Sequence, residues 1–145
     1  MYHVISFVGP PGHGKTHFLT GCTDTAYVAT LAPRKYIVPR ADNTFFEAWD
    51  TPGLMRYAEE VERTMRRCDA HLLVLREKLP DMERYERWIR TKPGCWVVVA
   101  LADVEALRAW AELQRVAFCR VREEEDVWVA AECALEHVVP RMRPA

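Results

Sequence analysis

Residues 9–16 of the chain read Gly9-Pro-Pro-Gly-His-Gly-Lys-Thr16, "GPPGHGKT". The stretch matches G-x-x-x-x-G-K-[ST], a loop whose backbone N–H groups surround nucleotide phosphates. An apolar run at residues 3–8 predicts a buried strand before it, and residues 15–22 predict a helix after it. Phosphate binding requires this context, because the start of the helix adds its positive dipole end to the loop. The stretch therefore predicts a nucleotide-binding α/β fold.

Each residue type in this loop has a physical role toward a phosphate group. The glycines let N–H groups converge on an anion, because they carry no Cβ atom. Lys15 is expected to reach the β- and γ-phosphates, and Thr16 to ligate Mg²⁺ through its hydroxyl. We assign no catalytic role to His13, whose side chain is expected to point away from the phosphates. The predicted nucleotide-binding residues here are Gly9, Gly12, His13, Gly14, Lys15, Thr16 and His17.

Apolar runs and helical periodicities alternate along the rest of the chain. Strand patterns cover residues 36–38, 44–49, 70–75, 95–101 and 127–129. Helical patterns cover residues 54–68, 82–89, 103–113 and 131–142, with Leu113 expected on the inner side. Residues 41–43 predict a hairpin turn, and residues 116–126 fit either a strand or a solvated turn. The alternation predicts the α/β fold class, a three-layer P-loop NTPase fold: a mostly parallel six-stranded sheet with one antiparallel hairpin strand and helices on both faces.

Length and composition limit the classes of protein to which the chain can belong. A chain of 145 residues suits one domain, residues 1–145. The apolar fraction is 50% and the net charge is −1, so we expect a globular protein without a nucleic-acid partner. Scattered cysteines predict free thiols, and we expect no signal peptide and no membrane span. A cytoplasmic location follows. The cysteines are Cys22, Cys68, Cys95, Cys119 and Cys133.

A second polar group, Asp50-Thr-Pro-Gly53, ends the predicted hairpin. An aspartate at a strand end suits Mg²⁺ held through a bridging water. Gly53 offers an N–H to a γ-phosphate with no side chain in the way. The pattern D-x-x-G is weak by itself, but its place after a hairpin strand and before a helix makes it stronger.

The two motifs, in this order and spacing, resemble those of the P-loop GTPases of the TRAFAC class. "HGKT" and the stretch "DTPGLMRYAEEVERTMRRCDAHLLVL" look most like the G domain of elongation-factor-type translational GTPases, without the beta-barrel domains after it. AAA+ motor ATPases also favour "GPPGxGKT". However, that family carries Asp-Glu after an apolar strand, where this chain has Arg76-Glu77. The resemblance implies a single G domain that binds GTP or GDP with Mg²⁺.

The resemblance also implies roles for residues in the remaining GTPase motifs. Thr30, or alternatively Thr25, is the candidate threonine of the first switch. Asp103 stands where the fourth motif has its guanine-binding aspartate, and a helix N-cap is its plainer role. The asparagine and lysine of that motif are replaced by Ala100-Leu101. A backbone N–H at Ala131, after the predicted last strand, is the candidate for the guanine O6.

Leu54 follows Gly53 where the resemblance places the residue that orients the attacking water. Leucine has no polar atom, so the resemblance implies slow intrinsic hydrolysis; otherwise Leu54 simply joins the apolar face of its helix. The candidate catalytic residues are Lys15, Thr16, Thr30 and Gly53. The candidate metal ligands are Thr16, Thr30 and Asp50.

Three functions remain open from the sequence. One is a Mg²⁺-dependent GTP/GDP switch that meets an effector or regulator protein through loops 24–34 and 50–58. Another is a pseudo-GTPase interaction module with little turnover, which Leu54 and Ala100-Leu101 favour. The third is an ATPase or small-molecule kinase on a related P-loop fold, which ranks last because no lid or pair of substrate-binding arginines is evident.

Overall fold

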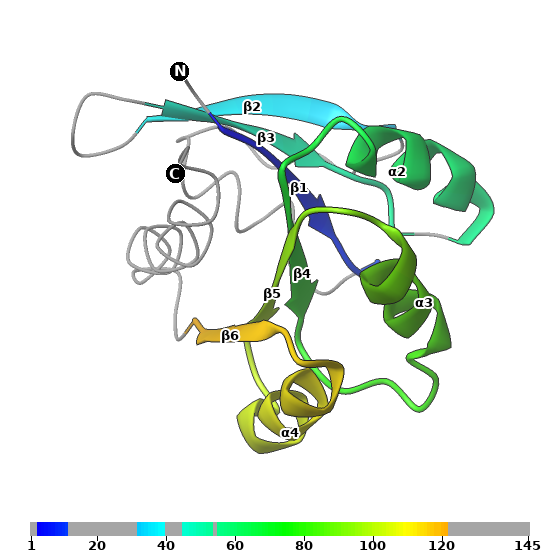
Figure 1. Cartoon of the computed structure of the whole chain (residues 1–145), viewed down its shortest axis with the longest axis vertical. Coiled ribbons are helices and arrows are strands. Elements are labelled where there is room, and N and C mark those ends of the chain that lie inside the picture. The colour runs from blue at the N-terminus through cyan, green and yellow to red at the C-terminus, as the bar shows by residue number, and fades with distance from the viewer. Residues whose placement is uncertain (1–2, 12–31, 40–44, 54, 122–145) are drawn as a thin grey trace.

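The computed structural model describes residues 3–11, 32–39, 45–53 and 55–121. Six strands in these ranges form one sheet in the order β2-β3-β1-β4-β5-β6 (Figure 1). Every neighbouring pair is parallel except β2 and β3, which are antiparallel. The strands are β1 (His3–Val8), β2 (Arg34–Pro39), β3 (Phe45–Asp50), β4 (Ala70–Leu75), β5 (Cys95–Ala100) and β6 (Ala117–Arg120). This is a P-loop NTPase-like α/β fold, so the predicted fold class is confirmed. The helices predicted over residues 15–22 and 131–142 lie outside the described residues.

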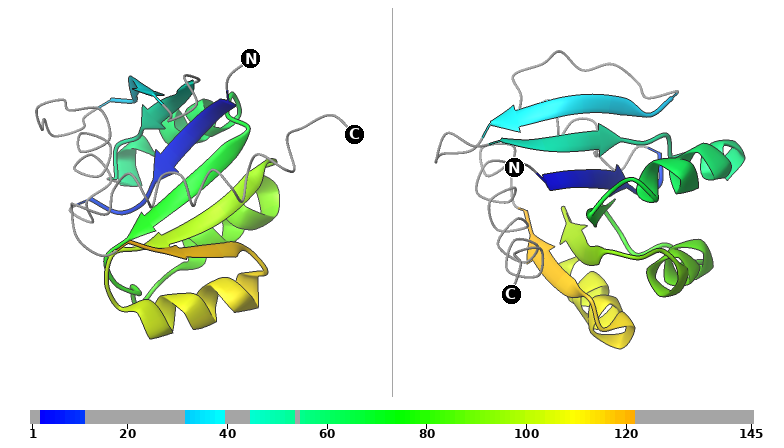
Figure 2. Two further views of the ribbon diagram at one scale, coloured as in Figure 1. Left: turned by 90° about the vertical axis from the view of Figure 1, so that its left-hand side faces the viewer. Right: turned by 45° about the horizontal axis from the view of Figure 1, so that its top comes forward.

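Helices alternate with the strands and lie on one face of the sheet in the described part of the chain (Figure 2). Their apolar side chains and those of β4 and β5 form one core cluster, which includes Trp88 and Leu107. A second cluster, which includes Phe7 and Phe46, occupies the other face of the sheet. The helical elements are η1 (Met55–Tyr57), α2 (Ala58–Met65), α3 (Glu83–Thr91) and α4 (Val104–Gln114).

The sixth strand and one helix face differ from the sequence-based expectation. Strand β6 is Ala117–Arg120, within the segment whose pattern was ambiguous, whereas residues 127–129 lie outside the described residues. Leu113 was expected to face inward but is 79% exposed, and Ala111 is buried in its place. Helix α4 thus buries positions 107, 110 and 111. At about 100° per residue, Leu113 lies roughly 120° from Leu107 and roughly 160° from Ala111 around the helix, so it falls outside this stripe.

A serine and a histidine form a buried polar pair inside the sheet. Ser6 Oγ of β1 lies 2.7 Å from Nδ1 of His71 on β4, and both side chains are fully buried. The other ring nitrogen, Nε2, lies 2.8 Å from the carbonyl oxygen of Pro93 and donates to it. Nδ1 is therefore the acceptor of the Ser6 hydroxyl. With no solvent access, the pair joins β1, β4 and the entry to β5, and has no route to a substrate.

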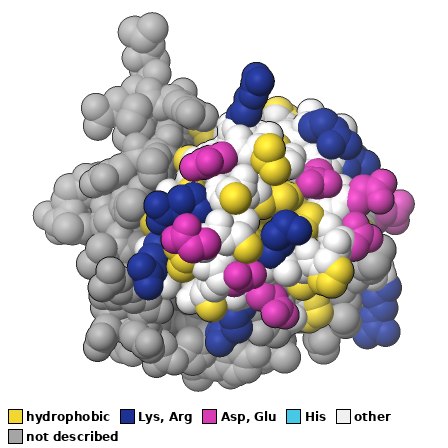
Figure 3. Space-filling view, turned by 90° about the horizontal axis from the view of Figure 1, so that it is seen from below, with side chains coloured by type: hydrophobic (Ala, Val, Ile, Leu, Met, Phe, Trp, Pro, Cys, Tyr) yellow, Lys and Arg dark blue, Asp and Glu magenta, His cyan; other side chains and the backbone are white. Residues whose placement is uncertain are grey.

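Acidic and basic side chains alternate on the face of the molecule viewed from below (Figure 3). Exposed apolar side chains are few among the described residues, and the large ones are Ile37, Phe45 and Leu113. Among the helices of the described part, none is long and apolar enough to cross a membrane.

Candidate functional site

The carboxyl ends of β1 and β3 lie side by side. Phe7 of β1 is in register with Asp50, the last residue of β3. Thr51 follows at once, and it donates both its backbone N–H (3.2 Å) and its hydroxyl (2.7 Å) to the carbonyl of Phe7. The segment after β3 is therefore bonded to the strand that enters the phosphate loop. Buried backbone groups at this edge are satisfied within the protein, which fixes the path of the chain.

Gly9 begins the phosphate loop in a conformation that only glycine adopts readily. Its φ is +150°, and a Cβ atom there would collide with the carbonyl oxygen of Val74 on β4. A side chain would thus force β1 and β4 apart at the point where the loop leaves the sheet. The structure supports the sequence-based requirement for glycine at this position.

Gly53 brings the two motifs into contact. A Cβ atom on Gly53 would overlap the backbone nitrogen of Pro11 and lie 2.7 Å from the carbonyl carbon of Pro10. The backbone of Gly53 therefore packs directly on the Pro10–Pro11 peptide, the first half of the phosphate loop. Gly53 itself is buried, as are Thr51 and Pro52. Segments that are far apart in the sequence meet here because parallel strands end at the same edge of the sheet.

Asp50 places a carboxylate at the same edge. Its side chain is fully buried. An ionised carboxylate in such a place needs a compensating charge or hydrogen bonds. Magnesium prefers carboxylate oxygen and water as ligands, so the donor chemistry of Asp50 fits the metal role expected from the sequence.

Arg84, in the first turn of α3, contacts the Asp50–Gly53 segment from the helix side. Its Nη2 lies 3.3 Å from the carbonyl oxygen of Gly53 and 2.9 Å from the hydroxyl of Tyr85. Burial raises the pKa of Tyr85, so the hydroxyl stays neutral at physiological pH. Arg84 was not among the predicted site residues, because an arginine near the start of a helix matches no sequence motif.

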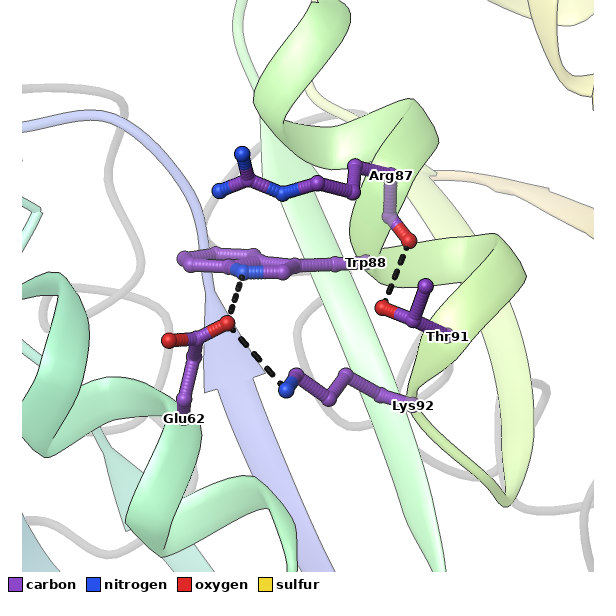
Figure 4. Close-up of polar contacts among 5 residues, drawn as sticks. All are labelled: Glu62, Arg87, Trp88, Thr91 and Lys92. Carbon is purple, nitrogen blue, oxygen red and sulfur yellow. Dashed lines mark hydrogen bonds and ion pairs between the residues drawn. The ribbon is translucent and has the colours of Figure 1, made fainter.

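Polar contacts of Glu62 join helix α2 to helix α3 (Figure 4). Trp88 of α3 donates its indole N–H to Oε1 of Glu62 on α2, at 3.1 Å, and Lys92 forms an ion pair with the same oxygen at 3.1 Å. Burial raises the pKa of Glu62, but the hydrogen bond and charge of Lys92 and the Trp88 bond outweigh it and hold the pKa below 4.5. The helix that follows Gly53 is thus held against α3.

Asp103 stands at the end of β5, just before α4. It adopts a left-handed conformation with φ +52° and makes no side-chain capping hydrogen bond. Its Oδ2 instead accepts the backbone N–H of Lys78 at 2.9 Å, which ties the loop after β4 to the start of α4. Asp103 therefore occupies the N-cap position of α4 as predicted, but its side chain does not form the capping hydrogen bond expected of an N-cap residue. The contact with Lys78 was not predicted, since residue type does not show which backbone N–H donates to a side chain.

Many of the residues predicted from the sequence lie outside the described part of the chain. The described ranges bring Gly9, Asp50 and Gly53 together at the ends of β1 and β3. Asp103 follows β5, which is separated from β1 by β4. The roles of the others stay predictions. The residues outside the described ranges are Gly12, His13, Gly14, Lys15, Thr16, His17, Thr25, Thr30, Leu54 and Ala131.

The structure changes the basis on which Ala131 was predicted to contact the guanine O6. Ala131 was selected because it follows the expected last strand at 127–129. The sixth strand of the described sheet ends at Arg120, so the residue that directly follows it is Val121. Ala131 lies outside the described residues, so its role stays a prediction.

Comparison with known proteins identifies the fold. No protein-family profile matches the chain, and no curated protein sequence matches it. Among solved structures, the bacterial selenocysteine-specific elongation factor EF-Sec is similar, with a TM-score of 0.76 and 18% sequence identity. The fold is G-domain-like. The similarity covers 94% of this chain and 29% of that one, so the chain spans less than a third of the length of EF-Sec.

Other kinds of site find no support in the described residues. No group of three or more His, Cys, Asp or Glu side chains gathers there in a way that could hold a metal ion. Of the described cysteines, Cys68 and Cys95 are free thiols. Burial raises the pKa of Cys68 to about 12, which leaves its thiol protonated and unreactive.

Proposed function

We propose that this chain is a small GTP-binding protein, a Mg²⁺-dependent GTP/GDP switch with slow intrinsic hydrolysis. The observation that carries the proposal is the packing of Gly53 on the Pro10–Pro11 peptide. A γ-phosphate seated in the phosphate loop would lie beside this contact, within reach of the Gly53 backbone. The presence or absence of that phosphate would then be transmitted to the segment leading into α2.

In this proposal the phosphate loop holds the nucleotide and the buried aspartate completes the metal site. Lys15 neutralises the β- and γ-phosphates, and Thr16 and Thr30 ligate Mg²⁺ with Asp50 acting through water. The metal, when bound, withdraws negative charge from the transferred phosphoryl group. Leu54 supplies no polar atom to orient the attacking water. Hydrolysis is consequently slow until a partner provides that group.

The base is proposed to be guanine, selected by Asp103. One carboxylate oxygen of Asp103 accepts the N–H of Lys78, which holds the group in a defined orientation. The other oxygen can accept from the N1 and N2 donors of guanine. Adenine has no matching donors at these positions, so a carboxylate here disfavours ATP. The substitution of Ala100 and Leu101 for the asparagine and lysine of the motif reduces the total binding energy.

Loops 24–34 and 50–58 are the proposed contact region for an effector or regulator protein, in a cytoplasmic setting. The second of these loops is the one fastened to α3 in the described structure. A partner that contacts it would sense the state of Gly53 and could supply the missing catalytic group. This part of the proposal rests on the motif pattern and on the position of the loop next to α2.

Titration of the full chain with GDP, GTP and ADP in the presence of Mg²⁺ tests the proposal. GDP is expected to bind more tightly than ADP, and Asp103→Ala should weaken GDP binding roughly 10- to 100-fold, the range for a hydrogen bond to a charged group. ADP binding should not change in that variant. Glu105→Ala, an exposed carboxylate in the first turn of α4, is the matched control. Tighter binding of ADP than GDP would favour the P-loop ATPase instead.

The second candidate is a nucleotide-binding interaction module with little turnover. Leu54 and Ala100-Leu101 favour it, because both changes remove groups that a GTPase uses. Single-turnover incubation with GTP separates the two functions. Release of phosphate within minutes by the wild type, lost in Lys15→Ala, supports the switch; no release supports the module.

A further inference from the structure

The position of Arg84 gives it access to the backbone of the Asp50–Gly53 segment. Arg84 is half-buried in the first turn of α3, and its Nη2 donates to the carbonyl oxygen of Gly53 at 3.3 Å. An arginine guanidinium remains charged at all physiological pH values, so this is a charge-assisted hydrogen bond to a neutral carbonyl. The contact joins the segment after β3 to α3, although α2 and β4 lie between them in the chain.

The guanidinium is held in place by aromatic rings on its own helix. It lies 5.0 Å from the ring centroid of Tyr85 and 5.1 Å from that of Trp88. The same Nη2 donates to the Tyr85 hydroxyl at 2.9 Å, and the two rings meet edge to face with centroids 5.7 Å apart. Trp88 in turn is bonded to Glu62 of α2. Arginine loses little further side-chain entropy on bonding to Gly53, because its position is already restricted.

Gly53 is also contacted by the phosphate loop. Its backbone packs on the Pro10–Pro11 peptide with no room for a Cβ atom. Gly53 is therefore held between the phosphate loop and Arg84, at the point where the proposed function needs its N–H to meet a γ-phosphate. The N–H and carbonyl of Gly53 are separated by its φ and ψ bonds. Packing on the Pro10–Pro11 peptide together with the bond from Arg84 limits rotation about both, and so restrains the N–H.

We infer that Arg84 is a positioning residue that holds Gly53 ready for the γ-phosphate and so raises the affinity for the triphosphate over the diphosphate. The inference rests on the proposed function of the site. Preorganisation improves binding because the entropy cost of ordering the loop is met before the ligand arrives. A diphosphate does not reach Gly53 and gains nothing from this restraint.

Affinities of the full chain for GDP and for a non-hydrolysable GTP analogue, measured by calorimetry with Mg²⁺, test the inference. In Arg84→Ala we expect the dissociation constant of the GTP analogue to rise about tenfold, the size of one charge-assisted hydrogen bond, and that of GDP to change less than about twofold. Arg84→Lys keeps the charge without the planar fork and should recover only part of the loss. Arg90→Ala, an exposed arginine near the end of α3, is the matched control and should change neither constant.

Hydrogen exchange of the nucleotide-free protein gives a readout that does not depend on GTP binding. Arg84→Ala should speed exchange in the peptide covering residues 51–57 and leave β4 unchanged. Unchanged exchange there would show that Arg84 does not restrain the segment and would overturn the inference. An equal loss of affinity for both nucleotides together with a lower melting temperature would show Arg84 to be only structural and would also overturn it. If the wild type binds no guanine nucleotide, the proposed function fails and the role of Arg84 toward the γ-phosphate fails with it.

Discussion

Gly53 shows how one residue can serve two contacts. Its backbone lies against Pro10 and Pro11 on one side and accepts a hydrogen bond from Arg84 on the other. Any side chain would break the first contact, because the overlapping atoms belong to the backbone of a proline pair that cannot yield easily. The requirement for glycine here is therefore steric.

His71 leads to a prediction about pH. Burial lowers the pKa of His71 below 6.5, although the hydrogen bond to Pro93 and the charge of Asp69 act in the opposite direction. Below pH 6.5 the unfolded chain binds a proton that the folded chain does not. The free energy of unfolding should thus fall with decreasing pH, by at most about 1.4 kcal/mol per pH unit from this residue, until the folded pKa is reached. Urea denaturation between pH 7.5 and 5 measures this slope.

The matched variant for this measurement is His71→Gln, which cannot titrate. Its stability at pH 7.5 should be lower, because Ser6 and the Pro93 carbonyl lose well-placed partners. Its slope between pH 6.5 and 5 should nevertheless be shallower than that of the wild type. Equal slopes in the two proteins would assign the pH dependence to other groups.

Helices α2 and α3 behave as a pair because Glu62 joins them. Glu62 accepts from Trp88 and pairs with Lys92, and these contacts hold its pKa below 4.5. The side chain of Glu62 is 25% exposed, so water screens part of the attraction. The pair still matters, since it fixes the helix that follows Gly53 to the helix that carries Arg84.

Neutralising Glu62 should loosen this pair of helices. We expect Glu62→Gln to lower the free energy of unfolding by about 1 kcal/mol at pH 7, because one hydrogen bond loses its charge and the ion pair is lost. The difference from wild type should shrink as the pH falls through the lowered pKa of Glu62, where the wild-type carboxylate is itself protonated. Chemical denaturation at pH 7 and pH 3.5 measures both effects. Glu59→Gln, an exposed residue of the same helix, should change stability by much less; an equal change would contradict the role of Glu62.

The molecule as a whole places the candidate site at one edge of a mostly parallel sheet. Strands β1 and β3 end together, and β5 runs parallel to β1 and ends at Ala100, shortly before Asp103. A ligand at this edge would contact several elements at once. Its binding energy would therefore add to the stability of the whole fold.

Bound nucleotide should raise the melting temperature. A GTP analogue at 100 times its dissociation constant adds about 2.7 kcal/mol, which corresponds to a rise of roughly 5–10 °C for a chain of this size. Removing Mg²⁺ with a chelator should reduce the shift, since the phosphates then lose a counter-charge. Differential scanning fluorimetry measures it. A shift of the same size in Lys15→Ala, or one insensitive to the chelator, would contradict the proposed mode of binding.

The fold class was predictable because its signals are local. The run Val97, Val98 and Val99 indicates a buried strand by its composition. The position of Gly9 between a predicted strand and a predicted helix indicates the phosphate loop. The sixth strand was harder to predict, because "AFCR" is short and its burial depends on β5 beside it. Leu113 was placed wrongly because positions spaced by three residues drift around a helix of about 3.6 residues per turn, which carries Leu113 away from the stripe of Leu107, Trp110 and Ala111.

The order of elements, the requirement for glycine at positions 9 and 53 and the candidate phosphate and metal ligands all follow from the amino-acid sequence, since each depends on residue type and short-range pattern. The contact of Gly53 with Pro10 and Pro11, the bond from Arg84 and the pairing of Asp103 with Lys78 exist only in the folded chain. These contacts join residues far apart in sequence through backbone groups that every residue possesses. No pattern of side chains can encode them, and the packing of the sheet and its helices decides which of them form.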